Sequence, residues 1–392
     1  MISTRVASID ILRAITMILM IFVNDLWSLT NIPQWLEHVE RGEDGIGLAD
    51  TIFPAFLFIV GLSIPFSIDS RQAKGDTNWQ LIQHVLIRIV ALLVMGVFFV
   101  NGEAINEIAS GIPRLLYNTL CCISFILIWN VYPKTGNKNW ILIGKGIGIL
   151  ILVALAFIYR GGESGSYFSP RWWGILGLIG WAYGASGLVT IFANKNLLAI
   201  LSGWIFFSLL SIASHAGLVP HGGVFSFIPN PILSGTLVAL TLGGVLTSFI
   251  FKYYLNRNEY KRLIVVFASI SILLIGLSIV TRPYWGLSKL GATPAWLFLC
   301  SAFTILAFAI IYWITDVKGK ANWFDAIKPA GTDTLLCYLI PYFSYALVSL
   351  SGIRWPEIML TGPSGLIKSF LFALLCVWIT GRLNKVGVKL KL

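Results

Sequence analysis

Residues 263–281, LIVVFASISILLIGLSIVT, form an apolar stretch without a single charge. About 20 such residues in a helix cross the roughly 30 Å hydrocarbon core of a bilayer. Similar windows recur along the whole chain, at 9–29, 48–68, 82–100, 115–131, 140–158, 172–193, 197–218, 232–251, 294–315, 332–350 and 365–381. The sequence therefore predicts an all-α polytopic membrane protein with about 12 transmembrane helices. Only residues 194–196 separate 172–193 from 197–218, so 10 or 11 helices are alternatives.

The composition supports this class. The 392 residues are 57% hydrophobic and 11% charged, with a mean hydropathy of +0.83, whereas soluble proteins are roughly 25% charged. These values exclude a soluble enzyme, a nucleic-acid binder and a disordered protein. Because the windows leave only short connections, we expect one transmembrane domain over 1–392. The five cysteines lie inside apolar runs without disulfide or metal-ligand spacing, so we expect core cysteines and no metal.

The distribution of cations predicts the orientation. One alternate set of connections, which includes both ends of the chain, carries 17 Lys and Arg residues, and the other set carries 7. Cytoplasmic connections of membrane proteins are enriched in Lys and Arg. We therefore expect both termini in the cytoplasm, with Lys134 and the run 252–262 on the same side and His38 on the outside.

The first window contains unusually many polar side chains. A charge in the middle of a membrane costs roughly 2.5–3.5 kcal/mol on insertion scales. Asp10 and Arg13 lie three positions apart and can pair on one helix face, with or without a functional role. Asn24 and Asp25 lie about 21 Å further along the same helix, near its outer end.

His38 is the strongest candidate for catalysis. It lies in the connection 30–47 among acidic residues, and Asp50 opens the next window. Histidine titrates near pH ~6.5 and serves as a general base, although a lone loop histidine is often only solvated. His84, His215 and His221 have no acidic neighbours that would complete a site. The sequence contains no G-x-S-x-G, H-E-x-x-H or P-loop motif.

Five stretches together resemble the heparan-α-glucosaminide N-acetyltransferase family of transmembrane acyltransferases and its bacterial relatives. They are SIDILRAITMILMIFVND (8–25), WLEHVERGEDGIGLADTIFPAFLFIVGLSIPF (35–66), IPRLLYNTLCCISFILIWNVYP (112–133), LSKLGATPAW (287–296) and YWITDVKGKANWFDAIKPAGTDTLLCYLIPY (312–342). The chain departs from the family pattern at Ala14, at RGEDGIG (41–47) and at Tyr117-Asn118.

The resemblance implies an enzyme that moves an acetyl group from cytoplasmic acetyl-CoA to an amine, such as a glucosamine-type sugar, on the outer side. The catalytic histidine of the family matches His38, its aspartate matches Asp50 and its asparagine matches Asn24. His38 would then be the general base, Asp50 would fix the ring tautomer, and the Asn24 amide would donate to the thioester oxygen or position the acceptor. A covalent acetyl-histidine and a direct transfer remain alternatives.

Further expectations concern the partners. Arg13, Arg88 and Lys318 are candidates for contacts with the phosphates of CoA, although the preference for inner cations explains such residues without a ligand. The acids around His38 would attract a protonated sugar amine, or are simply a solvated face. We expect contact with membrane lipid, location in a bacterial inner membrane, a possible homodimer and no nucleic acid.

Three other functions are alternatives. An O-acetyltransferase of a surface glycan would use the same donor chemistry. A secondary transporter often has 12 spans with both ends inside, but it usually shows related halves, which this sequence lacks. A scaffold protein is a third alternative, disfavoured by the charges of the first window.

Overall fold

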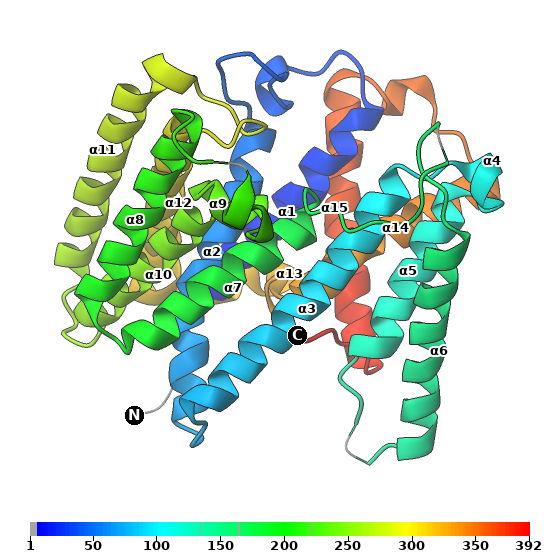
Figure 1. The fold of residues 1–392 in the computed structure, drawn as a ribbon, viewed down its shortest axis with the longest axis horizontal. Helices are drawn as coiled ribbons and strands as arrows, with labels where there is room; N and C mark the ends of the chain where they lie inside the picture. The colour runs from blue at the N-terminus through cyan, green and yellow to red at the C-terminus, as the bar shows by residue number, and fades with distance from the viewer. Residues whose placement is uncertain (1–5, 134, 164, 221) are drawn as a thin grey trace. The chain divides into compact units, whose positions relative to one another are not determined.

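The structure, a computed structural model, describes residues 6–133, 135–163, 165–220 and 222–392 (Figure 1). The long helices are α1 (Ala7–Asp25), α2 (Leu48–Gln72), α3 (Asn78–Glu103), α5 (Arg114–Trp129), α6 (Lys138–Ile158), α7 (Ile175–Ala193), α8 (Leu197–His215), α10 (Thr236–Leu255), α11 (Tyr260–Trp285), α12 (Pro294–Tyr312), α14 (Thr334–Ser351) and α15 (Gly362–Lys385). Short helical segments lie between them: η1 (Leu26–Ser28), η2 (Gln34–Leu36), α4 (Glu107–Ser110), η3 (Gly223–Phe227), α9 (Asn230–Leu233), η4 (Trp313–Val317), η5 (Ala321–Ile327), α13 (Lys328–Thr332) and η6 (Glu357–Met359). Within the described part of the chain, β-structure is limited to isolated bridges.

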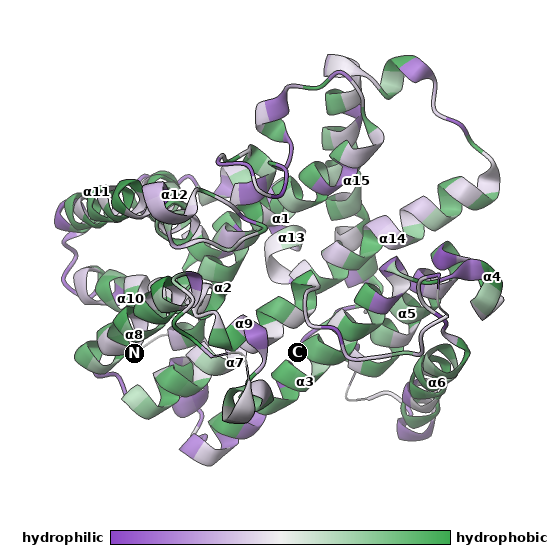
Figure 2. Cartoon of the chain, turned by 45° about the horizontal axis from the view of Figure 1, so that its top comes forward, coloured by the Kyte–Doolittle hydropathy of each residue, from purple (hydrophilic) through white to green (hydrophobic). Residues whose placement is uncertain are grey.

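The predicted all-α membrane architecture is confirmed. Each apolar window of the sequence coincides with one long helix, and 11 of these helices are long and apolar enough to cross a membrane. The remaining one, α5, is a shorter apolar helix. Hydrophobic residues cover most of the helical length, while hydrophilic residues gather at helix ends and in connections (Figure 2). The chain is therefore an integral membrane protein, and the orientation of its termini stays a prediction.

The closely spaced windows 172–193 and 197–218 are two separate helices. Asn194 and Lys195 adopt positive φ angles of 44° and 67°, which end α7 in a left-handed turn. The Asn196 side chain then accepts hydrogen bonds from the N–H groups of Leu198 and Ala199 and caps the start of α8. Residues 194–196 are enough to separate the two helices, because the left-handed turn and the Asn196 cap involve only neighbouring residues.

Contacts divide the chain into two compact units. Unit 1 comprises Met1–Thr16, Pro33–Val90 and Leu178–Asp325, and unit 2 comprises Met17–Ile32, Ala91–Gly177 and Ala326–Leu392. The prediction of a single domain stays a prediction. Lys134 and His221, which entered the predictions of orientation and site, lie outside the described residues.

Unit 1 is built around the contact between α2 and α10, and α10 also contacts α8 and α12. A Cβ added at Gly61 would lie 1.8 Å from the Thr241 carbonyl oxygen, and one added at Gly244 would lie 1.9 Å from that of Phe58. Small residues allow two membrane helices to approach this closely. α12 in turn packs along α11 (Figure 1). This framework fixes the first turn of α2, where the candidate site begins.

In unit 2, α5 packs against α6 and α14, and α14 contacts α15. In this unit the carboxylate of Asp25 is buried, which would be unfavourable for an unpaired charge, but both of its oxygens have partners. It accepts hydrogen bonds from the Tyr345 hydroxyl at 2.9 Å and the Ser369 hydroxyl at 2.6 Å, and it pairs with the Lys368 ammonium at 3.0 Å. A buried charge is tolerated when it is paired and hydrogen-bonded in this way.

Two other predictions of the sequence are confirmed. Arg13 Nη1 donates to Asp10 Oδ1 at 3.1 Å, as their i, i+3 spacing predicts. Arg13 also donates to the Ser63 hydroxyl of α2 at 2.6 Å. All five cysteines are buried and free.

Candidate active site

His38 lies in the loop between η2 and α2, and this loop closes on itself at Gly47. A Cβ added at Gly47 would lie 1.9 Å from the Glu37 carbonyl oxygen. Any larger residue would push the end of the loop away from its beginning. Glycine therefore lets the chain return to the neighbour of His38 just before α2 starts.

Asp50, in the first turn of α2, holds this loop through both of its carboxylate oxygens. Oδ1 lies 2.7 Å from His38 Nδ1, and Oδ2 accepts hydrogen bonds from the N–H groups of Val39 at 3.0 Å and Gly47 at 3.1 Å. Three donors around one side chain favour an ionised carboxylate, which only accepts, and the helix N-terminus also favours an anion. One acid therefore fixes the loop and the ring together.

The Asp50 carboxylate determines the tautomer of His38. Because the carboxylate accepts, Nδ1 of the ring carries the proton and Nε2 carries the lone pair. The His38 side chain is 44% exposed while that of Asp50 is 2% exposed. The ring is thus held through Nδ1 by a buried carboxylate, while the side chain as a whole is partly exposed. The structure brings together the two residues that the sequence placed 12 positions apart, and their catalytic roles stay predictions.

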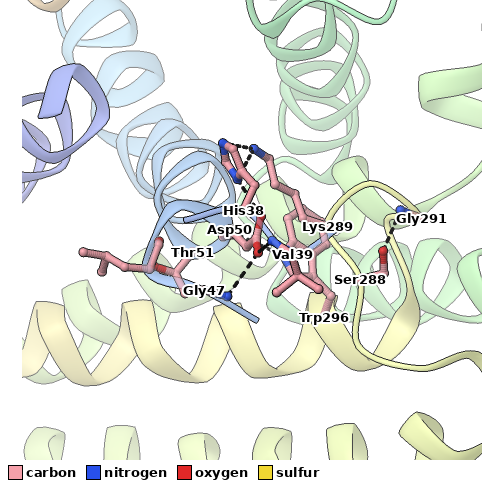
Figure 3. Close-up of polar contacts among 10 residues, drawn as sticks. His38, Val39, Gly47, Asp50, Thr51, Ser288, Lys289, Gly291 and Trp296 are labelled. Atoms are coloured by element: carbon pink, nitrogen blue, oxygen red, sulfur yellow. Dashed lines mark hydrogen bonds and ion pairs between the residues drawn. The ribbon is translucent and has the colours of Figure 1, made fainter. Parts of the chain in front are cut away.

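Lys289 completes the group, and sequence reasoning missed it. It comes from the connection between α11 and α12, and its Nζ lies 3.3 Å from each ring nitrogen of His38 (Figure 3). Burial lowers the pKa of the Lys289 ammonium, and the negative charge of Asp50 opposes this effect. The only signal in the sequence was the presence of this lysine inside the stretch 287–296.

Asp44 ties the two connections that carry the histidine and the lysine. Both of its oxygens accept from Arg282 Nε, at 3.0 and 3.1 Å, and Oδ1 also accepts from the Leu287 N–H at 2.7 Å. Gly45 N–H donates to the Leu287 carbonyl at 3.0 Å. The hydrogen bond from Leu287 and the bond to Arg282 lower the pKa of the Asp44 carboxyl. These contacts hold the connection that carries His38 against the one that carries Lys289, and they therefore fix the distance between the two side chains.

Trp296 supports Asp50 from below (Figure 3). Its indole Nε1–H donates to the backbone carbonyl of Asp50 at 3.0 Å, and the side chain is only 1% exposed. Trp296 belongs to the first turn of α12, so this bond joins the start of α12 to the start of α2. Asp50, which orients the His38 ring, is thus held where the ends of two packed helices meet, and not by a loop alone.

The other predicted site residues have different surroundings. Asn24 belongs to unit 2 and is exposed near the end of α1. The Arg88 guanidinium lies 4.5 Å from the Tyr183 ring centroid, and its buried Nε has no hydrogen-bond partner among the described residues. Lys318 Nζ lies 5.2 Å from the Trp313 ring centroid. Their proposed contacts with substrate stay predictions.

The remaining described histidines have structural partners. Arg71 Nη2 lies 3.0 Å from His84 Nδ1, and His215 contacts the backbone carbonyls of Ser211 and Gly291. Within the described part of the chain, no group of three His, Cys, Asp or Glu side chains is arranged to hold a metal ion. The chemistry that this site offers is proton transfer at His38, next to a fixed cation.

The fold and this site define an integral membrane protein that carries a histidine–carboxylate pair at the start of its second long helix. The chain belongs to the family described as "Domain of unknown function (DUF5009)", whose model matches residues 5–214. That range includes both His38 and Asp50.

The chain is also similar to two curated proteins. It is 33% identical over 101 residues to heparan-alpha-glucosaminide N-acetyltransferase of Homo sapiens, and 30% identical over 103 residues to the protein of the same name of Mus musculus. Each match covers 25% of this chain and 14% of the relative, so the likeness spans about one seventh of those proteins. These matches confirm the resemblance found in the sequence.

Proposed function

We propose that this protein is a membrane acetyltransferase that transfers an acetyl group from acetyl-CoA to an amine, with His38 as the general base. The observation that carries the proposal is the 2.7 Å contact between His38 Nδ1 and a buried carboxylate, with the ring 44% exposed. This arrangement places the lone pair of the ring on Nε2, the atom that takes the substrate proton. The likeness to two N-acetyltransferases supports the acetyl group and the amine.

The reaction passes one proton through His38 in two steps. The acceptor first loses the proton of its ammonium form to solvent, and its neutral nitrogen then attacks the thioester carbonyl. Nε2 takes a second proton from the attacking nitrogen, and the C–S bond then breaks. Nε2 returns the proton to the departing CoA thiolate. Asp50 remains ionised and stabilises the imidazolium that forms between these two steps.

The surroundings of His38 support an amine acceptor. Glu37, Glu40 and Glu43 are exposed on the same loop, so their negative charge attracts a protonated glucosamine-type sugar. For the donor, Arg88 offers a buried Nε without a described partner, whereas Arg13 is already bound to Asp10 and Ser63. Arg88 and Lys318 are accordingly favoured over Arg13 as partners of the CoA phosphates.

The site also has a proposed place in the cell. The excess of cations in alternate connections supports a donor from the cytoplasm and an acceptor from outside, in a bacterial inner membrane. Membrane lipid surrounds the helices, and a homodimer is compatible with this arrangement. Labelling of single cysteines with an impermeant reagent tests the sidedness, and labelling of position 38 only from the cytoplasm would contradict it.

The test of the activity uses the purified full-length protein in detergent, acetyl-CoA, and a panel of glucosamine-type amines and glycans. We expect release of free CoA together with a product that contains a new amide. A product with a new ester would identify an O-acetyltransferase instead. Absence of acetyl-CoA binding to folded protein would contradict the enzyme and favour a transporter.

A further inference from the structure

Lys289 presents a cation directly to the proposed base. Its Nζ lies 3.3 Å from both His38 nitrogens, while Asp50 Oδ1 lies 2.7 Å from Nδ1. An ammonium only donates, and the Nε2 lone pair is the acceptor left on the ring. In the resting site the lysine therefore faces a neutral imidazole, because a protonated ring would bring two cations together at this distance.

Proton transfer to His38 changes this balance of charge. Once Nε2 takes a proton from the acceptor, the imidazolium and the Lys289 ammonium face one carboxylate, that of Asp50. The arrangement is balanced only if a second negative charge develops beside them. The tetrahedral intermediate of acyl transfer supplies that charge on the former carbonyl oxygen.

From this geometry we infer that the Lys289 ammonium stabilises the oxyanion of the tetrahedral intermediate. The inference rests on the proposed acetyl transfer, and Lys289 is not among the site residues predicted from the sequence. Lys289 is in this account a catalytic residue, because it touches a reacting atom.

The separation of the two nitrogens suits this role. The attacking nitrogen and the oxyanion are bonded to the same carbon, so they are close neighbours. With Nε2 and Nζ 3.3 Å apart, the first can bond the nitrogen while the second bonds the oxygen. Each contact then has an ordinary hydrogen-bond length of about 2.7–3.1 Å.

The surrounding structure holds the ammonium in place before the reaction. Lys289 is half-buried. Leu287, two residues before it, donates its backbone N–H to the Asp44 carboxylate. A cation fixed in a partly desolvated site stabilises a developing anion more strongly than a mobile cation in water. The lysine keeps its proton throughout, so the balance of the reaction is unchanged: the N–C bond forms, the C–S bond breaks, and one proton passes through His38.

The test compares Lys289→Met, which removes the charge, with Lys289→Arg, which keeps it. The matched control is Lys261→Met, an exposed lysine at the start of α11. For each full-length variant, the unfolding temperature, acetyl-CoA binding, kcat and KM are measured with the same amine acceptor. Mass spectrometry after turnover checks position 289 for an acetyl group.

We expect kcat of Lys289→Met to fall by roughly 10²–10³-fold, with acetyl-CoA binding and unfolding temperature near wild type. Lys289→Arg should recover a large part of this loss, and Lys261→Met should behave as wild type. Wild-type turnover by Lys289→Met would overturn the inference while leaving the proposed function intact. A loss confined to KM, or an acetylated Lys289, would also overturn it. No transfer by the wild-type protein would instead contradict the proposed function.

Discussion

Replacing Asp50 with asparagine should separate the chemistry of the site from its folding. Both carboxylate oxygens of Asp50 accept hydrogen bonds, whereas an asparagine side chain has one oxygen and one NH₂ group. If the amide oxygen keeps the backbone N–H groups of Val39 and Gly47, the NH₂ group donates to His38 Nδ1. The ring must then carry its proton on Nε2, and the base has no lone pair for the acceptor.

The opposite orientation of the amide costs more. It places the NH₂ group against two backbone N–H donors, one buried and one part-buried. Each loses its acceptor at a cost of about 1–3 kcal/mol, or roughly 2–6 kcal/mol for the two together. The orientation with the wrong tautomer is therefore favoured. A corresponding change in the Ser-His-Asp triad lowers the rate by about 10⁴-fold. For Asp50→Asn we expect a loss of roughly 10²–10⁴-fold with little change in stability.

The assay is release of CoA from acetyl-CoA by purified protein with an amine acceptor, beside a thermal unfolding curve of the same sample. Glu357→Gln is the matched control, because it changes an exposed acid outside the site to an amide. A rate for Asp50→Asn within about tenfold of wild type would show that Asp50 does not set the tautomer of the base, since general-base catalysis contributes more than that. Unfolding of the variant would show that the acid acts mainly on the fold.

Three further outcomes follow from the structure. Gly47→Ala should displace the loop from the start of α2 and lower acetyl transfer by at least about tenfold, since an effect of geometry alone reaches roughly 10²-fold; an unchanged rate would show that the loop tolerates a Cβ there. Lys368→Met should leave the buried Asp25 carboxylate without its cation and destabilise the protein by about 3 kcal/mol, at the lower end for broken buried pairs because two hydroxyl donors remain; an unchanged unfolding temperature would contradict this. The pKa of Asp44 is lowered, so its contribution to stability is present above the ordinary value near 3.8 and is lost as the pH falls through the lower folded value. Protection of the Leu287 amide from hydrogen exchange should therefore fall in that acidic range in the wild type, whereas in Asp44→Asn it should be weak at every pH and show no such step.

The parts of the site that sequence reasoning found are close together in the chain. His38 and Asp50 are 12 positions apart across the start of one helix, so the loop and the helix N-terminus already limit their separation. The pair Asp10 and Arg13 is predictable for the same reason, since one helical turn brings them together. In the fold, apolar runs of about 20 residues identify the long helices with little ambiguity.

Contacts between distant segments were not predictable in this way. Lys289 meets His38 across 251 positions, and the contact depends on how α11 and α12 pack beside α2. The pairing of Asp25 with Lys368 similarly joins the first and last long helices. A single sequence gives the period of a helix and the cost of a buried charge, but it does not say which distant charge relieves that cost.

The role of His38 as the base is tested by the rate of acetyl transfer of His38→Ala relative to wild type, with acetyl-CoA binding measured on the same preparation. The ring is 44% exposed, so its removal should leave folding nearly unchanged, and Asp50 keeps its two backbone donors. We predict a fall of roughly 10²-fold or more in kcat with acetyl-CoA still bound. Near-normal turnover by folded His38→Ala would contradict the assignment of His38 as the base.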